Sequence, residues 1–449
     1  MVACKNGLGK QTVLGRVRPP VFPETLIRPH NQQSPPTCHH SRSGFSCCLL
    51  LLAVSFCAIF LPTTPAQAKL LQNTEKKFFP VPVFETRPDE GQTYGLMPVV
   101  LFSEKESQAI SLILATIGQY NTVVHASGAV ALYYYPHPVK NPEEVFDFYF
   151  EFAQKVYRET TLHYSNPNLT EHIFVDGSFL WLETPFGRFY GYGPETSSVA
   201  ESSFTSKNLK SRITFGYFVL PKLRVNLTEQ IASTSLSAGI IPDTADTLAS
   251  FAGTTGVVDN TSLLHSLSLT YDTRPSGMNS QTGVLLEGTY FFAIPGLVST
   301  DTLNGFSLQA IGLLPWKNKK MVSALRFFLQ DMFGKDIPFY MQSSLGGPNE
   351  LRSYVPGRFT DTGKVILSAE HRFHVLSAKV FHVPLQLHID PFVEFGRVFS
   401  HVGDFGFDHW QPVVGIGLRG KVPPNVVARV DAALGREGYS VYTMLGFAF

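Results

Sequence analysis

The strongest constraint on the fold is an alternation of apolar and polar side chains at period two. From Val365 to His374 the odd positions read Val, Leu, Ala, His and Phe, and the even positions read Ile, Ser, Glu, Arg and His. Because successive side chains of a β-strand point to opposite faces, this segment predicts a strand with one mostly apolar face and one charged face. A soluble sheet would turn the charged face to water. A transmembrane barrel would turn the apolar face to lipid and the charged face to its lumen.

The same alternation recurs elsewhere and favours the barrel. In Glu144–Gln154 one face carries four phenylalanines, Phe146, Phe148, Phe150 and Phe152. Four exposed phenylalanines would be hazardous on a soluble protein, although a secreted β-sandwich or propeller could bury them. Such a soluble fold does not account for a chain that finishes on an apolar strand at Phe449.

These segments predict an all-β fold, a transmembrane antiparallel β-barrel. We count about 17 candidate strands between residues 93 and 449, one of them at 336–344. Single-chain bacterial barrels have an even number of strands, so we predict 16. The sheet must close, because an open edge would leave backbone groups unpaired in hydrocarbon.

The N-terminal residues predict export. Residues 1–68 contain a long basic region, a short apolar run at Leu49–Leu61 and Ala66-Gln67-Ala68, which fits a signal-peptidase site. We expect residues 69–92 to form a short periplasmic segment and residues 93–449 to form the barrel. All five cysteines precede Lys69, so the exported chain would have neither a disulfide nor a thiolate metal site.

Charge and motif content narrow the possible functions. The chain has 36 basic and 35 acidic residues, and removal of residues 1–68 leaves 30 against 34, which gives no reason to expect nucleic-acid binding. The histidines show no metal-ligand spacing, and we expect no metal and no other cofactor. His125 and Ser127 share a strand face, as in a barrel hydrolase, but no acidic partner is evident nearby, so we expect no enzyme.

Several motifs carry a family resemblance. Leu345-Gly346-Gly347 is followed by Leu351-Arg352-Ser353-Tyr354 in the segment before Val365. Further matches are Tyr271-Asp272-Thr273-Arg274, Glu370-His371-Arg372, Phe392-Val393-Glu394-Phe395-Gly396 and the terminal Phe449. With these motifs the chain resembles the BamA/TamA superfamily of bacterial surface antigen barrels, most strongly over residues 262–449.

The resemblance implies a set of site residues. The loop with Gly346, Gly347, Leu351 and Tyr354 would fold into the lumen, where Arg352 would pair with Glu370 and Glu394. A guanidinium offers five donors in a fixed fork, which suits two carboxylates on lumenal strand faces. Ser353 stands where the family has Gly, and Glu394 where it has Asp. Phe447 and Phe449 would belong to the C-terminal assembly signal.

The resemblance also implies a location and a role. It places the protein in the bacterial outer membrane, in contact with its lipids. The expected role is assembly or translocation, with other outer-membrane proteins or the assembly machinery as partners. About 25 residues, Lys69–Thr93, precede the first expected strand, too few for a POTRA domain, so we expect a barrel without POTRA domains. A passive pore or surface structure remains the alternative function.

Overall fold

The computed structural model describes residues 74–449 except 88–90, 108, 257–258, 276–279, 297–298, 300–301, 318–319, 381–382, 405, 423–425 and 446–447. The chain divides into two units, Met1–Pro62 and Thr63–Phe449, and every described residue belongs to the second unit. The signal peptide expected at 1–68 and the assembly-signal residue Phe447 therefore lie outside the described residues.

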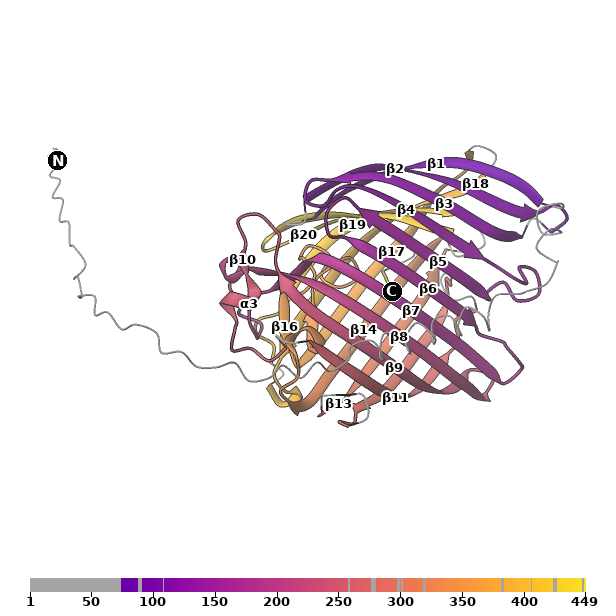
Figure 1. Cartoon of the computed structure of the whole chain (residues 1–449). Helices are drawn as coiled ribbons and strands as arrows, with labels where there is room; N and C mark the ends of the chain where they lie inside the picture. The colour runs from indigo at the N-terminus through magenta and orange to yellow at the C-terminus, as the bar shows by residue number, and fades with distance from the viewer. Residues whose placement is uncertain are drawn as a thin grey trace, which may run out of the picture. The chain divides into compact units, whose positions relative to one another are not determined.

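Within the described residues, 18 antiparallel strands form one closed wall (Figure 1). These strands are β1 (Thr74–Arg87), β2 (Gly91–Glu104), β3 (Ile110–Asn121), β4 (His125–Tyr134), β5 (Val145–Ala153), β6 (Arg158–Asn166), β7 (Ile173–Phe189), β8 (Ser202–Leu220), β9 (Leu223–Ala238), β11 (Asn260–Asp272), β12 (Gly283–Ala293), β13 (Thr302–Trp316), β14 (Met321–Lys335), β17 (Gly363–Val380), β18 (Val383–Phe399), β19 (Gln411–Val422), β20 (Val426–Gly435) and β21 (Gly438–Leu445). Each strand pairs with the next along the chain, and the Thr86–Val441 pair between β1 and β21 closes the sheet.

Short elements lie outside the wall. The connection between β9 and β11 holds β10 (Ala245–Asp246), which pairs in parallel with β8, and the helix α3 (Thr247–Ser250). The other short elements are η1 (Ser198–Ala200), η2 (Phe339–Met341), β15 (Ser343–Leu345), β16 (Phe359–Asp361) and η3 (Val402–Asp404). No helix among the described residues is long and apolar enough to cross a membrane.

The all-β barrel is confirmed, but the wall has 18 strands where we predicted 16. The strand β1 lies within residues 69–92, which we expected to precede the barrel. It contains Pro80 and Pro82, and proline is tolerated where a strand edge is little used: β1 pairs fully with β2 only. The strand β6 was missed because its sequence, RETTLHYSN, lacks an apolar face. The candidate at 336–344 forms η2 and the start of β15, inside a loop, and not a wall strand.

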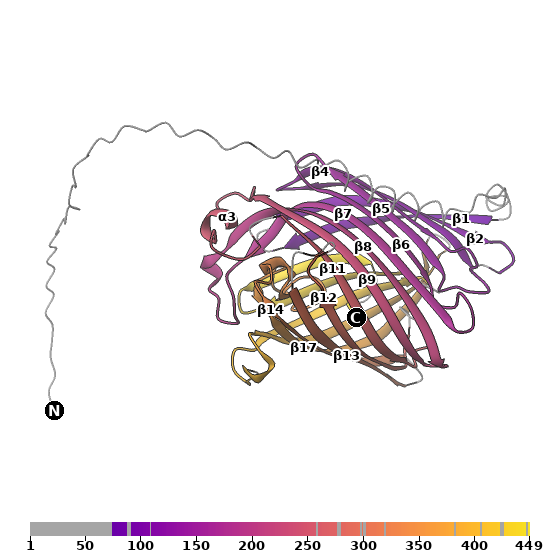
Figure 2. The same cartoon turned by 60° about the horizontal axis from the view of Figure 1, so that its bottom comes forward.

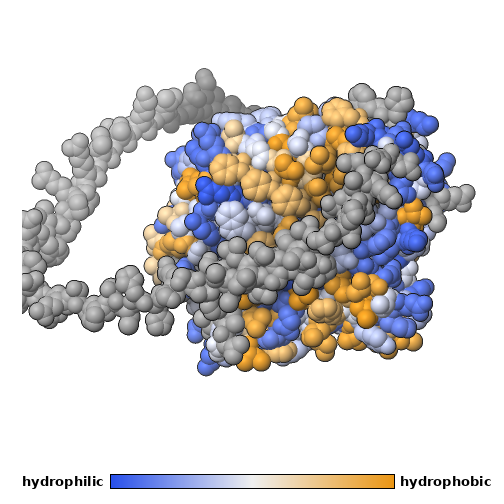
Figure 3. Space-filling view, turned by 45° about the vertical axis from the view of Figure 1, so that its right-hand side comes forward, coloured by the Kyte–Doolittle hydropathy of each residue, from blue (hydrophilic) through white to orange (hydrophobic). Residues whose placement is uncertain are grey.

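The outer surface of the wall is apolar. Large exposed hydrophobic side chains occur on most strands and include Phe150, Phe152, Leu267, Tyr290, Leu325 and Ile416. The outward position of Phe150 and Phe152 is the one predicted from their alternation. Figure 3 shows apolar residues over the strands of one flank, with hydrophilic residues gathered towards the ends. Such an outer surface suits lipid, and the polar face of each strand then lines the lumen.

The two ends of the barrel differ in loop length. The long connections 190–201, 239–259, 336–362 and 400–410 all follow strands that run in the same direction, so they share one end, where α3 and β16 appear in Figure 1. Figure 2 shows the same end from another side. Long loops are typical of the extracellular end of a bacterial barrel and short turns of the periplasmic end.

Candidate functional site: the lumenal loop and its ion network

The loop between β14 and β17 folds back against the inner wall. Its strands β15 and β16 form a two-stranded hairpin, with Leu345 paired to Phe359. Gly346 and Gly347 follow β15 with φ values of 115° and 107°, in the region that favours glycine. A Cβ atom on Gly346 would lie 2.0 Å from the Val355 carbonyl oxygen, so glycine is required for this close approach.

The loop packs through apolar side chains onto β17–β20. Leu345, Leu351 and Tyr354 are buried in one cluster with wall residues that include Ile366, Phe392, Val398 and Val413. Gly396 on β18 leaves the space that this packing needs, since a Cβ atom there would meet Leu351 at 3.0 Å. Burial raises the pKa of Tyr354, so its phenol stays protonated and donates to Gln411 Oε1 at 3.3 Å.

Arg352, at the tip of the loop, is fully buried among three carboxylates. Its Nε donates to Glu394 Oε1 at 3.0 Å, and its backbone N–H donates to Glu394 Oε2 at 2.8 Å. Its Nη1 lies 3.0 Å from Asp431 Oδ2 and 3.4 Å from Glu370 Oε2. The guanidinium also lies over the Phe392 ring, 3.3 Å from its centroid. The Nε and Nη1 edges of this cation are thus held by carboxylates and one of its flat faces by an aromatic ring.

Two of these carboxylates, Glu370 and Asp431, are shared with three arginines of the wall. Arg372 Nε donates to Glu370 Oε1 at 2.8 Å, Arg419 bonds both Glu370 and Asp431, and Arg429 Nη1 donates to Asp431 Oδ2 at 3.1 Å. Arg419 Nε also lies 3.4 Å from Asp390 Oδ2. The four guanidinium groups and four carboxylates form what we call the ion network, Arg352, Arg372, Arg419, Arg429, Glu370, Asp390, Glu394 and Asp431. Every guanidinium of the ion network lies against at least one carboxylate, and this pairing offsets part of the cost of burying the ions.

Further ion pairs hold the two sides of the loop. Glu350 accepts from Arg326 Nη2 at 3.1 Å and from Lys364 Nζ at 2.6 Å. Arg358 makes a bidentate pair with Glu437 in the turn between β20 and β21, at 2.7 and 2.6 Å. The loop is therefore tied to β14, β17 and the β20–β21 turn as well as to the ion network.

The structure brings together the residues that the resemblance singled out. Arg352 contacts both Glu370 and Glu394. Gly346, Gly347, Leu351 and Tyr354 belong to the loop that carries Arg352. Ser353, which replaces the family's glycine, fits because Gly435 on β20 leaves room for its side chain: a Cβ atom on Gly435 would lie 2.1 Å from Ser353 Oγ.

Sequence reasoning missed Asp431 and the wall arginines. Arg419 and Arg429 are direct partners across β19 and β20. Two like charges at facing positions require an anion between them, and Asp431 follows Arg429 on the same face at spacing two. The facing pair Arg419 and Arg429 would have predicted a nearby anion, but the two arginines are known to face each other only once the register of β19 and β20 is known.

The other predicted positions lie apart from this site. Phe449 packs against a lumenal apolar cluster on β13 and β14, and its carbonyl oxygen is 3.4 Å from Arg372 Nη2. His125 stacks on Tyr120, whereas Ser127 Oγ donates to Glu151 Oε1 at 2.9 Å, so these two residues make separate contacts. In the described part of the chain no group of three or more His, Cys, Asp or Glu residues could hold a metal ion.

Comparison with known proteins gives the family. Residues 146–434 match the family model described as the Omp85 superfamily domain. None of the curated proteins compared with the chain matches it significantly. Among solved structures, BamA from Haemophilus ducreyi lacking POTRA domains 1–3 has 14% identity and a TM-score of 0.50, over 77% of this chain and 72% of that chain.

CdiB from Escherichia coli is also similar, with 11% identity and a TM-score of 0.46, over 83% of this chain and 62% of that one. CdiB from Acinetobacter baumannii has 10% identity and a TM-score of 0.42, over 84% and 60%. Identities this low show a similarity of fold only. The family model, in contrast, matches well over half of the chain. The chain therefore belongs to the Omp85 superfamily and is a β-barrel of the bacterial outer membrane.

Proposed function

We propose that this barrel assists the assembly or translocation of other outer-membrane proteins, which are then its partners, by opening between β1 and β21. The observation that carries the proposal is the weak pairing of these two strands. Among the described residues β1 has 14 register partners on β2 but only one on β21, Thr86 with Val441. One further bond joins them, from Thr443 Oγ1 to the Phe84 carbonyl at 2.6 Å.

An edge of this kind can pair with another chain. A strand that leaves its N–H and C=O groups unpaired offers a template for an incoming strand. Opening at β1 and β21 would break few hydrogen bonds, whereas β20 and β21 are joined by eight register pairs. The wall would therefore part at β1 and β21 before it parted at the neighbouring pair.

The lumenal loop is linked to the same place. Ser440 and Tyr442 on β21 donate to the carbonyl oxygens of Ser353 and Tyr354, at 3.1 and 3.3 Å. Movement of β21 would therefore displace or break its bonds to Ser353 and Tyr354, the two residues that follow Arg352. We infer that the loop, held by Arg352, Glu370 and Glu394, acts as a lock on the closed barrel.

A disulfide across β1 and β21 tests the proposal. Thr86→Cys with Val441→Cys would join the two strands, and no native cysteine follows Cys57 to interfere. Directly facing residues of antiparallel strands lie close enough for such a bond. The matched control is Ala432→Cys with Val441→Cys, which joins β21 to β20 within an intact ladder.

The readout is the level of other outer-membrane proteins in cells depleted of the native protein. We expect the wild type and the control pair to restore these levels, and the Thr86–Val441 pair to do so only after mild reduction. Full rescue by the oxidised Thr86–Val441 pair would refute opening at this position. Normal levels in depleted cells, together with steady high conductance of the purified barrel in planar bilayers, would favour the passive pore instead.

A further inference from the structure

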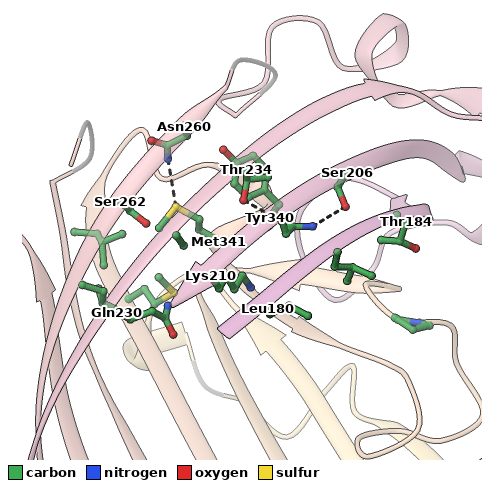
Figure 4. A pocket seen from close by; sticks show the side chains of 18 of the residues that line it. Leu180, Thr184, Ser206, Lys210, Gln230, Thr234, Asn260, Ser262, Tyr340 and Met341 are labelled. Carbon is green, nitrogen blue, oxygen red and sulfur yellow. Dashed lines mark hydrogen bonds between the residues drawn. The ribbon is translucent and has the colours of Figure 1, made fainter. Parts of the chain in front are cut away.

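The lumen holds a second feature beside the loop. A cavity of about 670 Å³ lies between β7, β8, β9, the strands β11 to β14 and the loop after β14, and we call it the side chamber (Figure 4). Hydroxyl and amide side chains make up much of its lining and include Ser206, Asn208, Gln230, Thr234, Asn260 and Ser262. Among its described lining residues none carries a carboxylate, and Lys210 is the one cation.

Lys210 has no counter-charge in its surroundings. Its register partners are Leu180 on β7 and Ala232 on β9, which offer no acceptor. Arg212, two residues further on the same face, is itself paired with Asp176 at 3.4 Å. Within the described residues Lys210 makes no ion pair or hydrogen bond, and its side chain is exposed to the space of the lumen.

The polar groups around Lys210 are partly ordered and partly available. Asn208 donates to Ser206 Oγ at 2.9 Å and accepts from Thr234 Oγ1 at 3.0 Å, so these three side chains hold each other in place. The side chains of Gln230 and Ser262 line the cavity and make no hydrogen bond among the described residues. A preformed pocket with a few convergent polar groups is the usual form of a small-molecule site.

Three glutamates lie in a different cavity from Lys210. A neighbouring cavity of about 440 Å³ is lined by Glu85, Glu151 and Glu159. The two cavities share Tyr157 and Phe186, whose ring centroids are 6.1 Å apart. An anion in the side chamber would thus meet Lys210 on one side and be repelled by the carboxylates beyond the aromatic pair.

We propose that the side chamber binds a small anionic polyol, of the class of the sugar phosphates. The Lys210 ammonium supplies the counter-charge, and the hydroxyl and amide groups of β8, β9 and β11 bind the ligand's hydroxyl groups. Phe291 and Met332, which also line the chamber, offer apolar contact to the ring. The proposal does not depend on opening between β1 and β21.

The test is calorimetric titration of the purified full barrel in detergent with glucose 6-phosphate, glucose and inorganic phosphate. Lys210→Met removes the charge from the chamber, and Lys210→Arg keeps it. Lys207→Met is the matched control, because Lys207 is on the same strand but on the opposite face, paired with Glu183 at 3.1 Å.

We expect glucose 6-phosphate to bind saturably to the wild type and more tightly than glucose or phosphate alone. A charge-assisted hydrogen bond predicts a loss of roughly 10- to 100-fold in affinity for Lys210→Met. Lys207→Met should bind like the wild type, and Lys210→Arg should retain most of the affinity. Equal binding by Lys210→Met and wild type, or no saturable binding to the folded wild type, would overturn the proposal. Binding of phosphate as tight as that of glucose 6-phosphate would overturn the polyol part.

Discussion

Replacement of Arg352 by alanine should release the lumenal loop from the wall. Glu370 and Asp431 would keep wall arginines as partners, whereas Glu394 Oε1 would lose the donor that lies 3.0 Å away. The ion network would then contain three cations and four anions with no access to solvent. Removing one partner of a buried ion pair typically costs about 3–5 kcal/mol. We expect a destabilisation of this size for the docked loop.

Cysteine labelling measures the population of the released loop. Val355 in the loop is buried, so we expect Val355→Cys to react slowly with a maleimide while the loop is docked and faster once the loop leaves the wall. Where closing is faster than labelling, the rate follows the open population. A loss of about 3–5 kcal/mol then predicts a labelling rate roughly 150- to 5000-fold higher in the Arg352→Ala background. Arg212→Ala, which removes a lumenal arginine away from the loop, should leave the rate unchanged.

A double substitution separates the charge effect from lost packing. Addition of Glu394→Gln to Arg352→Ala removes the orphaned carboxylate and should recover about 1 kcal/mol or more. If Arg352→Ala raises the labelling rate less than about tenfold, or if Glu394→Gln makes the double variant worse, then the ion network does not hold the loop.

Two further substitutions test the loop itself with the same Val355→Cys reporter. Gly346→Ala should raise the labelling rate, because a φ of 115° costs an alanine roughly 1–3 kcal/mol and its Cβ would overlap the Val355 carbonyl. Gly296→Ala, in the connection between β12 and β13, has a φ of 133° but open space around it, so it should have a smaller effect on the melting temperature and none on labelling. Burial raises the pKa of Asp361 above its ordinary value, so its ionisation destabilises the docked loop as the pH rises through that pKa. Asp361→Asn should therefore lower the labelling rate above this pKa and leave the rate unchanged below it. A decrease of the same size at every pH would show that the effect does not come from ionisation of Asp361.

The fold was predictable where one face of each strand is apolar. The phenylalanines of β5 lie on the outer surface as their alternation indicates, and Glu370 lies on the lumenal face of β17. Prediction failed at β6, whose outer face begins with Arg158 and Thr160, because period two is visible only when the two faces differ in polarity. It also failed at 336–344, where apolar residues pack inside the lumen and so imitate a strand that faces lipid.

The site was predictable only in part, for a different reason. Arg352 and its loop motif are local in sequence, whereas Asp431 lies 79 residues away and meets Arg352 through the register of β17–β20. No sequence spacing encodes that meeting. A family motif can single out the cation, but the full set of its acceptors follows from the closed sheet.

The ion network ties the docked loop to several strands of the wall at once. Its members come from the loop and from four consecutive strands, β17, β18, β19 and β20, so a shift of any one strand separates charges that are buried together. The next strand, β21, is bonded through Ser440 and Tyr442 to the residues that follow Arg352. Movement of β21 away from β1 would therefore strain the loop, and release of the loop would remove two of the bonds that hold β21 in place. Release of the loop should favour movement of β21 by the same free energy by which movement of β21 favours release of the loop, because coupling between two sites is reciprocal. A substitution that loosens the loop should accordingly raise the exposure of the edges of β1 and β21, even though Arg352 touches neither strand.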